Sequence, residues 1–290
     1  MNVIQTEGLT KDFPGGIRAV DRLDLGVDRG EIFGFLGPNG AGKTTTVRLL
    51  NGTLTPTGGR SVVLELESDG EGVRRRTSTL AELSQMYEHL SVWDNLVFFA
   101  EMYEIPGNDA RARITDLLRG MELWDKKDLK LGTFSTGMKK KAALARTLLN
   151  RPEIIFLDEP TSGLDPDVAQ QVTRLIHKLA KESGTTIFLC THNLPLAEGI
   201  CDTFGFISNG KLVATGKKEE MIDAVIQQKT VRIATTAGDE TFPIRGVEDI
   251  NGVIQQVLAQ GRQIVEVGMV RPTLEQVYFH YIGRRDDELA

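Results

Sequence analysis

Residues 37–44 have the sequence GPNGAGKT, which matches the phosphate-binding pattern G-x-x-x-x-G-K-[ST]. Glycines in this pattern let successive backbone N–H groups point at phosphate oxygens, and the helix that follows adds the positive end of its dipole. The pattern predicts that Lys43 reaches the β- and γ-phosphates and that the Thr44 hydroxyl binds Mg²⁺. The expected nucleotide-binding residues are Gly37, Pro38, Asn39, Gly40, Ala41, Gly42, Lys43, Thr44 and Thr45.

The residues on either side of this loop favour a nucleotide site over a chance match in a chain with 30 glycines. An apolar run, residues 32–36, precedes the loop, and residues 45–50 follow it with a helical pattern. The motif requires a strand before it and a helix after it, and both are expected here.

A second apolar run ends in two carboxylates, Asp158 and Glu159. A buried strand would bring Asp158 to Mg²⁺, directly or through water, and would leave Glu159 where a carboxylate can polarise an attacking water. Two acids after a strand can also begin a polar loop, but the phosphate-binding loop independently requires a magnesium partner. The sequence therefore predicts hydrolysis of a nucleotide, with Mg²⁺ as cofactor.

His192 follows a third apolar run, residues 186–190. If this run is a strand parallel to the one that carries Asp158, His192 lies at the same edge of the sheet as the phosphates. The other histidines, His89, His177 and His280, are interpreted as surface or core residues.

Short, continuously apolar runs are typical of parallel strands that are covered on both faces. Residues 32–36, 154–157 and 186–190 fit this description, and helical patterns lie between them. Residues 3–13 and 19–27 instead alternate apolar and polar side chains, which predicts an antiparallel hairpin. We expect an α/β fold with nucleotide at the carboxyl ends of the parallel strands.

Two helices are expected between the phosphate loop and the strand that ends at Asp158. Ser91 followed by Asp94 resembles a capping box that opens a helix to about Tyr103, and Asn108 starts a second helix to about Met121. They predict an inserted helical subdomain at about residues 84–135.

A further helix, residues 166–181, follows Asp165 as its N-cap. The pattern changes again after about Lys217. Strands at residues 231–234, 241–244 and 264–267 and helices at residues 247–259 and 273–282 predict a separate α+β unit. The expected domains are therefore residues 1–217 and 218–290.

The composition is that of an ordinary globular protein of 290 residues, with 40% apolar and 26% charged residues. A net charge of -6 argues against a general nucleic-acid or headgroup binder, because such surfaces are basic. The clusters Arg74-Arg75-Arg76 and Lys139-Lys140-Lys141 are interpreted as solvated faces. Cys190 and Cys201 suggest neither a disulfide framework nor a metal site.

No apolar run approaches the roughly 18 residues that cross a bilayer, and the first residues lack the pattern of a signal peptide. We expect no direct membrane insertion and no nucleic-acid partner. The chain is predicted to be soluble, or attached to a membrane only through a partner.

Several motifs together resemble those of ATP-binding cassette (ABC) ATPases. The sequence FSTGM at residues 134–138 is similar to the signature of that family, residues 162–165 resemble its D-loop, and Thr191-His192 resembles its switch histidine. The similarity covers about residues 3–227. It implies a P-loop NTPase cassette with a mixed sheet, an antiparallel β subdomain and an inserted helical subdomain, followed by the small C-terminal unit.

The resemblance implies a head-to-tail pair of cassettes. ATP bound by Lys43 and Thr44 of one chain would be covered by Ser135 and Gly137 of the other, where the start of a helix favours a γ-phosphate. Asp165 would communicate across the pair.

The family's other roles fall on three residues of this chain. The resemblance implies that Glu159 is the general base and that His192 senses the γ-phosphate or orients the water. Phe13 stands where the family stacks adenine, although a Phe beside Pro14-Gly15-Gly16 can equally be a core residue.

This sequence departs from the family at three positions. Where the family has a magnesium-binding glutamine, alignment places Glu82, with Gln85 as a displaced alternative. The charge of Glu82 would repel the γ-phosphate and slow or alter hydrolysis. Thr136 and Met138 replace the commoner glycine and glutamine, as in the ABC-2 type exporter group, which includes drug-resistance pumps.

The function implied is that of the ATPase subunit of an exporter, cytoplasmic and peripheral on the inner face of the membrane, with a separate transmembrane permease as partner. The permease is expected to dock on helices 91–121 and the loop around Glu82. Trp93, Phe98, Phe99 and Trp124 are core candidates first and interface candidates second.

Three alternatives are weighed against this reading. Soluble ABC ATPases usually carry two cassettes or a long coiled coil, and neither is found in this sequence. A GTPase or a small-molecule kinase is disfavoured, because no N-K-x-D guanine motif follows the sheet strands and the Asp158-Glu159 pair favours water as the nucleophile. A low-turnover nucleotide sensor remains open because of Glu82.

Overall fold

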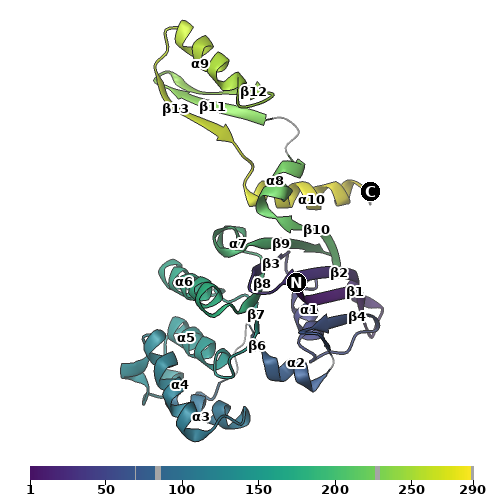
Figure 1. Ribbon diagram of the computed structural model, residues 1–290, viewed down its shortest axis with the longest axis vertical. Helices are drawn as coiled ribbons and strands as arrows, with labels where there is room; N and C mark the ends of the chain where they lie inside the picture. Colours follow the sequence, from purple (N-terminus) through teal and green to yellow (C-terminus); the bar gives the residue numbers. More distant parts are fainter. Residues whose placement is uncertain (69, 82–85, 226–228, 289–290) are drawn as a thin grey trace. The chain divides into compact units, whose positions relative to one another are not determined.

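The computed structural model describes residues 1–68, 70–81, 86–225 and 229–288, except for the side chains of residues 183 and 284–288. The chain consists of two compact units, Met1–Thr215 and Gly216–Ala290 (Figure 1). Among the described residues, no helix has both the length and the apolar character needed to cross a bilayer.

An antiparallel sheet in the larger unit has the strand order β2-β1-β4-β5. Buried and exposed residues alternate along most of β2, so one face of the hairpin packs on the core and the other meets solvent. The predicted hairpin is confirmed, because β1 pairs antiparallel with β2. The strands are β1 (Asn2–Phe13), β2 (Ile17–Asp28), β4 (Gly58–Val63) and β5 (Leu66–Glu67).

A second sheet of the larger unit has the order β10-β9-β3-β8-β7-β6. Its β6, β7, β8, β3 and β9 run parallel, which confirms the three predicted parallel strands and adds β6 and β9 to them. The strands are β3 (Ile32–Leu36), β6 (Thr77–Leu80), β7 (Ile154–Asp158), β8 (Thr186–Thr191), β9 (Thr203–Ser208) and β10 (Lys211–Lys217).

The parallel strands are buried on both faces, as their apolar composition predicts. On one face, Phe188 stacks on Phe33 and packs against Phe156, with ring centroids 5.4 and 5.8 Å apart, and α1 (Lys43–Leu50) joins this core. On the other face, Ile155 and Leu157 pack with the helical insert and α6 (Pro166–Ser183). The site-bearing strands are therefore fixed from both sides.

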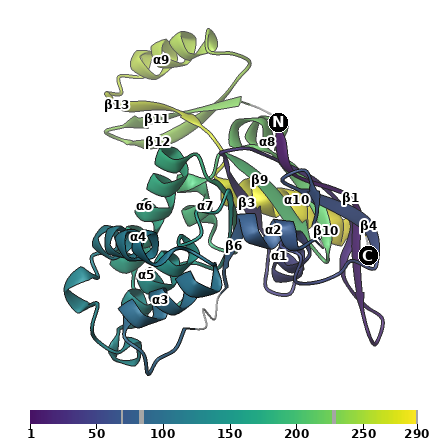
Figure 2. The same ribbon diagram turned by 60° about the horizontal axis from the view of Figure 1, so that its bottom comes forward.

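The helical insert follows β6. Helices α3, α4 and α5 lie side by side in it (Figure 2). Ser91 caps α3 by accepting a hydrogen bond from the Asp94 N–H at 3.0 Å, so the predicted cap is confirmed. Its elements are α3 (Val92–Met102), α4 (Gly107–Gly120), the 3-10 turns η1 (Trp124–Lys126) and η2 (Leu131–Thr133), and α5 (Thr136–Thr147).

The remaining helices of the larger unit are α2 (Glu71–Arg76) and α7 (Leu194–Ile200). The predicted helix from residue 166 is confirmed as α6, with Asp165 at its N-cap position but without a side-chain cap bond. Asp165 is exposed.

The smaller unit holds a three-stranded antiparallel sheet with the order β12-β11-β13. Val231, Ile233, Ile244 and Val257 form its core, which joins the sheet to α9. The three strands and two helices predicted here are found. The elements are α8 (Lys218–Val225), β11 (Lys229–Thr235), β12 (Gly238–Ile244), α9 (Asp249–Ala259), β13 (Ile264–Val270) and α10 (Leu274–Glu288).

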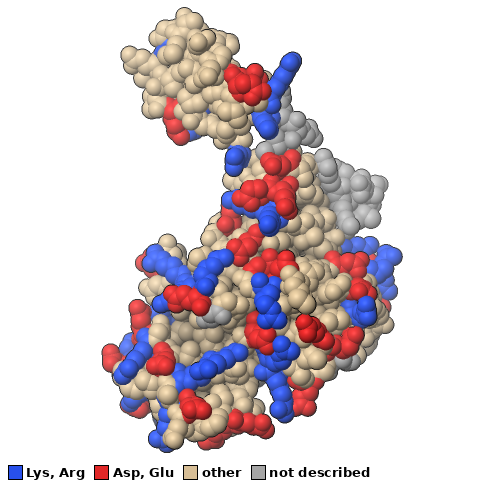
Figure 3. All heavy atoms as spheres, in the orientation of Figure 1, with Lys and Arg blue, Asp and Glu red and all other residues tan. Residues whose placement is uncertain are grey.

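Acidic and basic side chains are interspersed over the face of the larger unit drawn in Figure 3. The arginines of α2 follow this pattern. Arg75 pairs with Glu71 at 3.0 Å and Arg76 with Glu153 at 2.6 Å. This face therefore carries mixed charge, in agreement with the net charge of the chain.

Candidate nucleotide-binding site

The phosphate-binding loop joins β3 to α1 and needs glycine for two reasons. Gly40 and Gly42 have φ angles of 80° and 109°, in the left-handed region that favours glycine. A Cβ at Gly37 would lie 2.4 Å from the carbonyl oxygen of Ile207, and one at Gly42 would lie 2.3 Å from that of Ala19. The loop is thus shaped by its own backbone and by close contact with its neighbours.

Lys43 opens α1, and its side chain is only 6% exposed. Its Nζ donates to the carbonyl oxygens of Gly37 at 2.7 Å and Pro38 at 3.1 Å. The same ammonium lies 3.7 Å from Oε1 of Glu159. Lys43 is therefore held over the loop, between the loop carbonyls and a carboxylate.

Thr44 and Asp158 meet directly at the ends of two different elements. The Thr44 hydroxyl donates to Oδ2 of Asp158 at 2.7 Å. Asp158 is the last residue of β7, which pairs in register with β8, and β8 also pairs with the strand that leads into the loop. The parallel arrangement thus brings together two residues 114 positions apart.

The Glu159 carboxylate is held from three directions. Oε2 accepts from the Thr191 hydroxyl at 2.9 Å, and Oε1 accepts from the His192 backbone N–H at 3.0 Å. Nδ1 of His192 lies 2.7 Å from Oε1. Glu159 is buried, whereas the His192 side chain is 56% exposed, so the carboxylate is fixed at the bottom of the site.

The main chain of Glu159 is in a left-handed conformation, with a φ of 48°. Its N–H donates to the carbonyl oxygen of Cys190 at 2.9 Å, and its own carbonyl oxygen accepts from Nζ of Lys140 at 3.3 Å. Such a conformation is costly for a residue with a side chain and persists only where the surroundings hold it.

The Cys190 thiol lies near Asp158 and Glu159 and stays protonated. Burial raises the pKa of Cys190 well above its usual value, and the negative charge of Asp158 raises this pKa further. A protonated thiol is a poor nucleophile and a poor metal ligand.

The loop and the carboxylates line a cavity of about 180 Å³. Its lining residues are Ala19, Asn39, Gly40, Gly42, Lys43, Thr44, Thr45, Asp158 and Glu159. The signature residues Ser135 and Gly137 are not among them.

Ser135 and Gly137 lie at the start of α5. Ser135 is its N-cap and accepts from the Met138 N–H at 3.4 Å. A Cβ at Gly137 would lie 2.5 Å from Cγ1 of Val168, so this glycine allows α5 to pack closely on α6. In the first turn of α5, the N–H groups of Thr136 and Gly137 precede the first i→i−4 bond of the helix, so they are available to an anion.

Phe13 ends β1 and is 36% exposed. Nζ of Lys11 lies 5.5 Å from its ring centroid, within the range of a cation–π contact. The aromatic side chain is thus accessible to a ligand, although it does not line the cavity around the loop.

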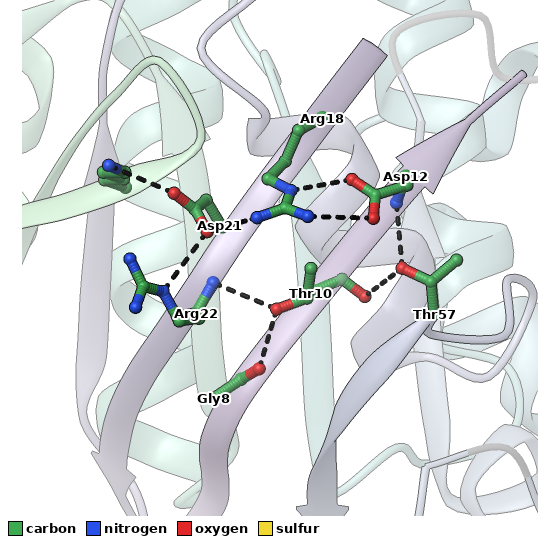
Figure 4. Close-up of polar contacts among 8 residues, drawn as sticks. Gly8, Thr10, Asp12, Arg18, Asp21, Arg22 and Thr57 are labelled. Atoms are coloured by element: carbon green, nitrogen blue, oxygen red, sulfur yellow. Dashed lines mark hydrogen bonds and ion pairs between the residues drawn. The ribbon is translucent and has the colours of Figure 1, made fainter. Parts of the chain in front are cut away.

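A polar network fixes the hairpin that carries Phe13 (Figure 4). Arg18 donates to both carboxylate oxygens of Asp12, at 2.8 and 3.2 Å, and to Asp21 at 3.2 Å. The Asp12 N–H donates to the Thr57 hydroxyl at 3.0 Å. The bond from Arg18 also lowers the pKa of Asp12, which keeps this carboxylate charged.

The structure therefore brings together Lys43, Thr44, Asp158, Glu159 and His192, and it leaves Phe13, Ser135, Gly137 and Asp165 outside the cavity lining. Glu82 and Gln85 lie outside the described residues, and the magnesium role of Glu82 stays a prediction.

The interpretation of Lys139-Lys140-Lys141 as a solvated face is wrong for the middle residue. Lys139 and Lys141 form ion pairs with Glu88 and Glu122, but Lys140 is only 8% exposed and reaches Glu159. Helical periodicity indicates that Lys140 is buried, because Lys140 shares a face of α5 with Gly137 and Leu144, which are also buried.

Comparison with known proteins agrees with this geometry. The model of the ABC transporter family matches residues 20–162. The daunorubicin resistance ATP-binding protein DrrA3 of Streptomyces coeruleorubidus is 33% identical, over 99% of this chain and 98% of that protein. A fluoroquinolones export ATP-binding protein of Mycobacterium tuberculosis is 40% identical, over 76% of this chain and 72% of its own length.

Solved structures show the same cassette. The structure of cbiO1 from Clostridium perfringens, part of the ABC transporter complex cbiONQ, has a TM-score of 0.69 at 27% identity and covers 77% of this chain and 94% of its own. The predicted cassette fold is confirmed, and so is the predicted ATPase activity. The chain therefore belongs to the ABC transporter family, as one of its ATP-binding and ATP-hydrolysing subunits.

Proposed function

We propose that two copies of this chain close on ATP and Mg²⁺, hydrolyse the ATP, and thereby drive a separate membrane permease that exports a small molecule. The observation that carries this proposal is the Glu159 carboxylate, which Thr191 and His192 hold beside Lys43 in the cavity of the phosphate loop. Two of the relatives are a daunorubicin resistance ATP-binding protein and a fluoroquinolones export ATP-binding protein, and they support the export direction.

The residues at the loop fit a magnesium ion. The Thr44 hydroxyl and the Asp158 carboxylate offer oxygen ligands, which Mg²⁺ prefers, and they already lie 2.7 Å apart. Mg²⁺ bound here supplies positive charge that offsets the charge of the phosphates. Lys43 adds a second positive charge, and its ammonium can turn from Glu159 to the γ-phosphate because their contact is long, at 3.7 Å.

Glu159 is the proposed general base. Oε1 and Oε2 each accept at least one hydrogen bond, which fixes the plane of the carboxylate and leaves its remaining lone pairs for a water proton. His192 holds Oε1 through Nδ1, and its exposed ring can reach the γ-phosphate of a bound nucleotide.

A second copy is proposed because the signature does not line the cavity of its own chain. The free N–H groups at the start of α5 favour an anion, so Ser135 and Gly137 would cover the γ-phosphate held by the other copy. Asp165 is exposed at the start of α6, next to α5, and would meet the same partner. Phe13 would stack on the adenine at the other end of the nucleotide.

Mixing two inactive variants tests this arrangement. Lys43→Ala removes the ammonium from the phosphate loop. Ser135→Asp keeps a good N-cap but places a negative charge at the proposed γ-phosphate site. Each variant alone should be inactive. A mixture should hydrolyse ATP, because a mixed pair has one site with an intact loop and an intact signature; phosphate release measures this. An inactive mixture would argue against a site shared between copies.

We propose the helical insert as the docking surface of the permease. Tyr87, Phe98 and Met102 are 50%, 37% and 63% exposed, and Tyr87 packs edge-on against Phe98 at 5.0 Å. Exposed apolar groups of this kind mark interaction sites. Trp93, Phe99 and Trp124 instead pack partly buried against the core. The interpretation of Phe98 as a core residue first is wrong, because its side chain is exposed.

A cavity of about 590 Å³ in the helical insert strengthens this choice. Arg113 and Arg151 line it together with Ile105, which follows α3. Burial, together with the nearby charge of Arg151, lowers the pKa of Arg113 to about 10. Asp109 and Asp116 line the same cavity, so its lining carries both signs of charge, which suits a polar segment of the permease.

Phe98→Glu should weaken binding to the proposed membrane permease by at least about tenfold, because interface aromatic residues contribute on the order of 2 kcal/mol each. ATP binding should not change. Co-purification from detergent measures the first quantity, with Val247→Glu, at a residue 68% exposed on the smaller unit, as the matched control. Equal recovery of both variants would place the docking surface elsewhere.

A further inference from the structure

Lys140 is a buried ammonium in the middle of three consecutive lysines. Its neighbours Lys139 and Lys141 form ion pairs with the exposed carboxylates of Glu88 and Glu122. Lys140 instead points inward, is 8% exposed, and donates to the main-chain oxygen of Glu159 at 3.3 Å. Burying an ammonium is costly unless polar partners compensate for the lost water, and the main-chain oxygen of Glu159 is one such partner.

One partner of Lys140 is the main-chain oxygen of Glu159, in the peptide that sets the direction of the Glu159 side chain. Glu159 has a φ of 48°, which the chain would leave if nothing held it. Three hydrogen bonds hold its backbone: the N–H donates to the carbonyl oxygen of Cys190 on β8, and the carbonyl oxygen accepts from the Ser162 N–H at 3.2 Å and from Nζ of Lys140 on α5 at 3.3 Å. Thr191 and His192, which hold the carboxylate, also lie on β8 or directly after it. Of these described contacts, Lys140 alone comes from the helical insert.

Helix α5 thus carries residues for both ATP sites of the proposed pair. Its first turn carries Ser135 and Gly137, which under the proposed function cover ATP held by the other copy. Lys140 lies three residues after Gly137, about 4.5 Å further along the helix axis. It contacts the base that acts on ATP held by its own chain.

We propose that Lys140 is a positioning residue that couples the two ATP sites of the pair. This inference rests on the proposed function. When the start of α5 binds the partner's γ-phosphate, Lys140 holds the Glu159 peptide in the orientation that hydrolysis requires. With the partner site empty, the start of α5 lacks its contact with the γ-phosphate, and the carboxylate is less well placed. Occupation of one site therefore activates the other, through one helix and one ammonium.

The test replaces Lys140 with methionine, which has a similar length and no charge. The rate of phosphate release and the Hill coefficient for ATP are measured for wild type and for Lys140→Met. Lys139→Met and Lys141→Met are the matched controls. We expect Lys140→Met to lose about tenfold in kcat, since displacement of a catalytic group by a fraction of an ångström has effects of this order. Its Hill coefficient should fall from near 2 toward about 1, while both controls stay as wild type.

Two further measurements separate positioning from a general loss of structure. The affinity of each variant for ATP and its melting temperature should stay near the wild-type values for Lys140→Met, because the ammonium does not line the nucleotide cavity. Lys140→Arg keeps a cation and should recover most of the cooperativity. A merely structural role would lower ATP affinity and stability and leave the Hill coefficient unchanged.

The inference is overturned if Lys140→Met matches its two neighbouring controls in both kcat and Hill coefficient. It is also overturned if the wild-type chain hydrolyses ATP without any cooperativity. A wild-type chain that releases no phosphate from Mg-ATP, with or without its permease, would instead refute the proposed function.

Discussion

Replacing Glu159 with glutamine should lower the rate of ATP hydrolysis by at least about a hundredfold, the lower range of what a general base contributes, while ATP still binds. Glutamine has nearly the same shape and keeps an oxygen that can accept from Thr191 or His192. It cannot take a proton from water. It also removes a negative charge that lies 3.7 Å from Lys43, so the ammonium becomes freer to bind phosphate.

Phosphate release and equilibrium binding of labelled ATP measure the two parts of this prediction. Glu122→Gln serves as the control, because Glu122 is a carboxylate of the same unit whose side chain is 79% exposed and forms an ion pair with Lys141 at 2.9 Å. It should hydrolyse ATP at the wild-type rate. Wild-type turnover by Glu159→Gln would show that another group is the base.

Lys43→Ala should weaken ATP binding by more than about a hundredfold, because hydrogen bonds to charged groups contribute about 1.5–3 kcal/mol each and Lys43 would make several to the phosphates. The methyl group of alanine also leaves Glu159 without its nearby positive charge, so the carboxylate would repel the nucleotide.

Thermal unfolding measures this effect without any turnover. ATP that binds only the folded chain raises the melting temperature of the wild type, and this shift should vanish in Lys43→Ala. Lys178→Ala, at an exposed lysine of α6, should keep the full shift. An equal shift in Lys43→Ala would show that ATP binds somewhere other than the phosphate loop.

The sequence predicts the elements whose pattern is local and strong. The parallel strands β3, β7 and β8 are continuous apolar runs, and the cap at Ser91 predicts the start of α3. β6 was not among the strands predicted from apolar runs, because three of its four residues are Thr77, Ser78 and Thr79. Thr77 and Ser78 are nevertheless buried, and Asn150 accepts a hydrogen bond from the Ser78 hydroxyl at 2.8 Å. Such polar burial depends on contacts that only the fold supplies.

The same limit applies to the site. The phosphate loop is contiguous, so its residues are predicted from the motif alone. The role of Thr191 at the Glu159 carboxylate depends on the register between β7 and β8, and that of Lys140 depends on how α5 packs against the end of β7. Distant segments make both contacts, and no short motif encodes them.

The mass of the Glu159→Gln chain in solution tests most directly whether two copies share the nucleotide between them. With Mg-ATP the variant should have twice the mass of the single chain by light scattering, and with Mg-ADP it should not. Adding Ser135→Asp should restore the single-chain mass while ATP remains bound, whereas Ser135→Asn, a neutral cap, should affect the pair less. The account would be contradicted if the mass of the Glu159→Gln chain were the same with Mg-ATP as with Mg-ADP. It would also be contradicted if adding Ser135→Asp left the amount of pair unchanged.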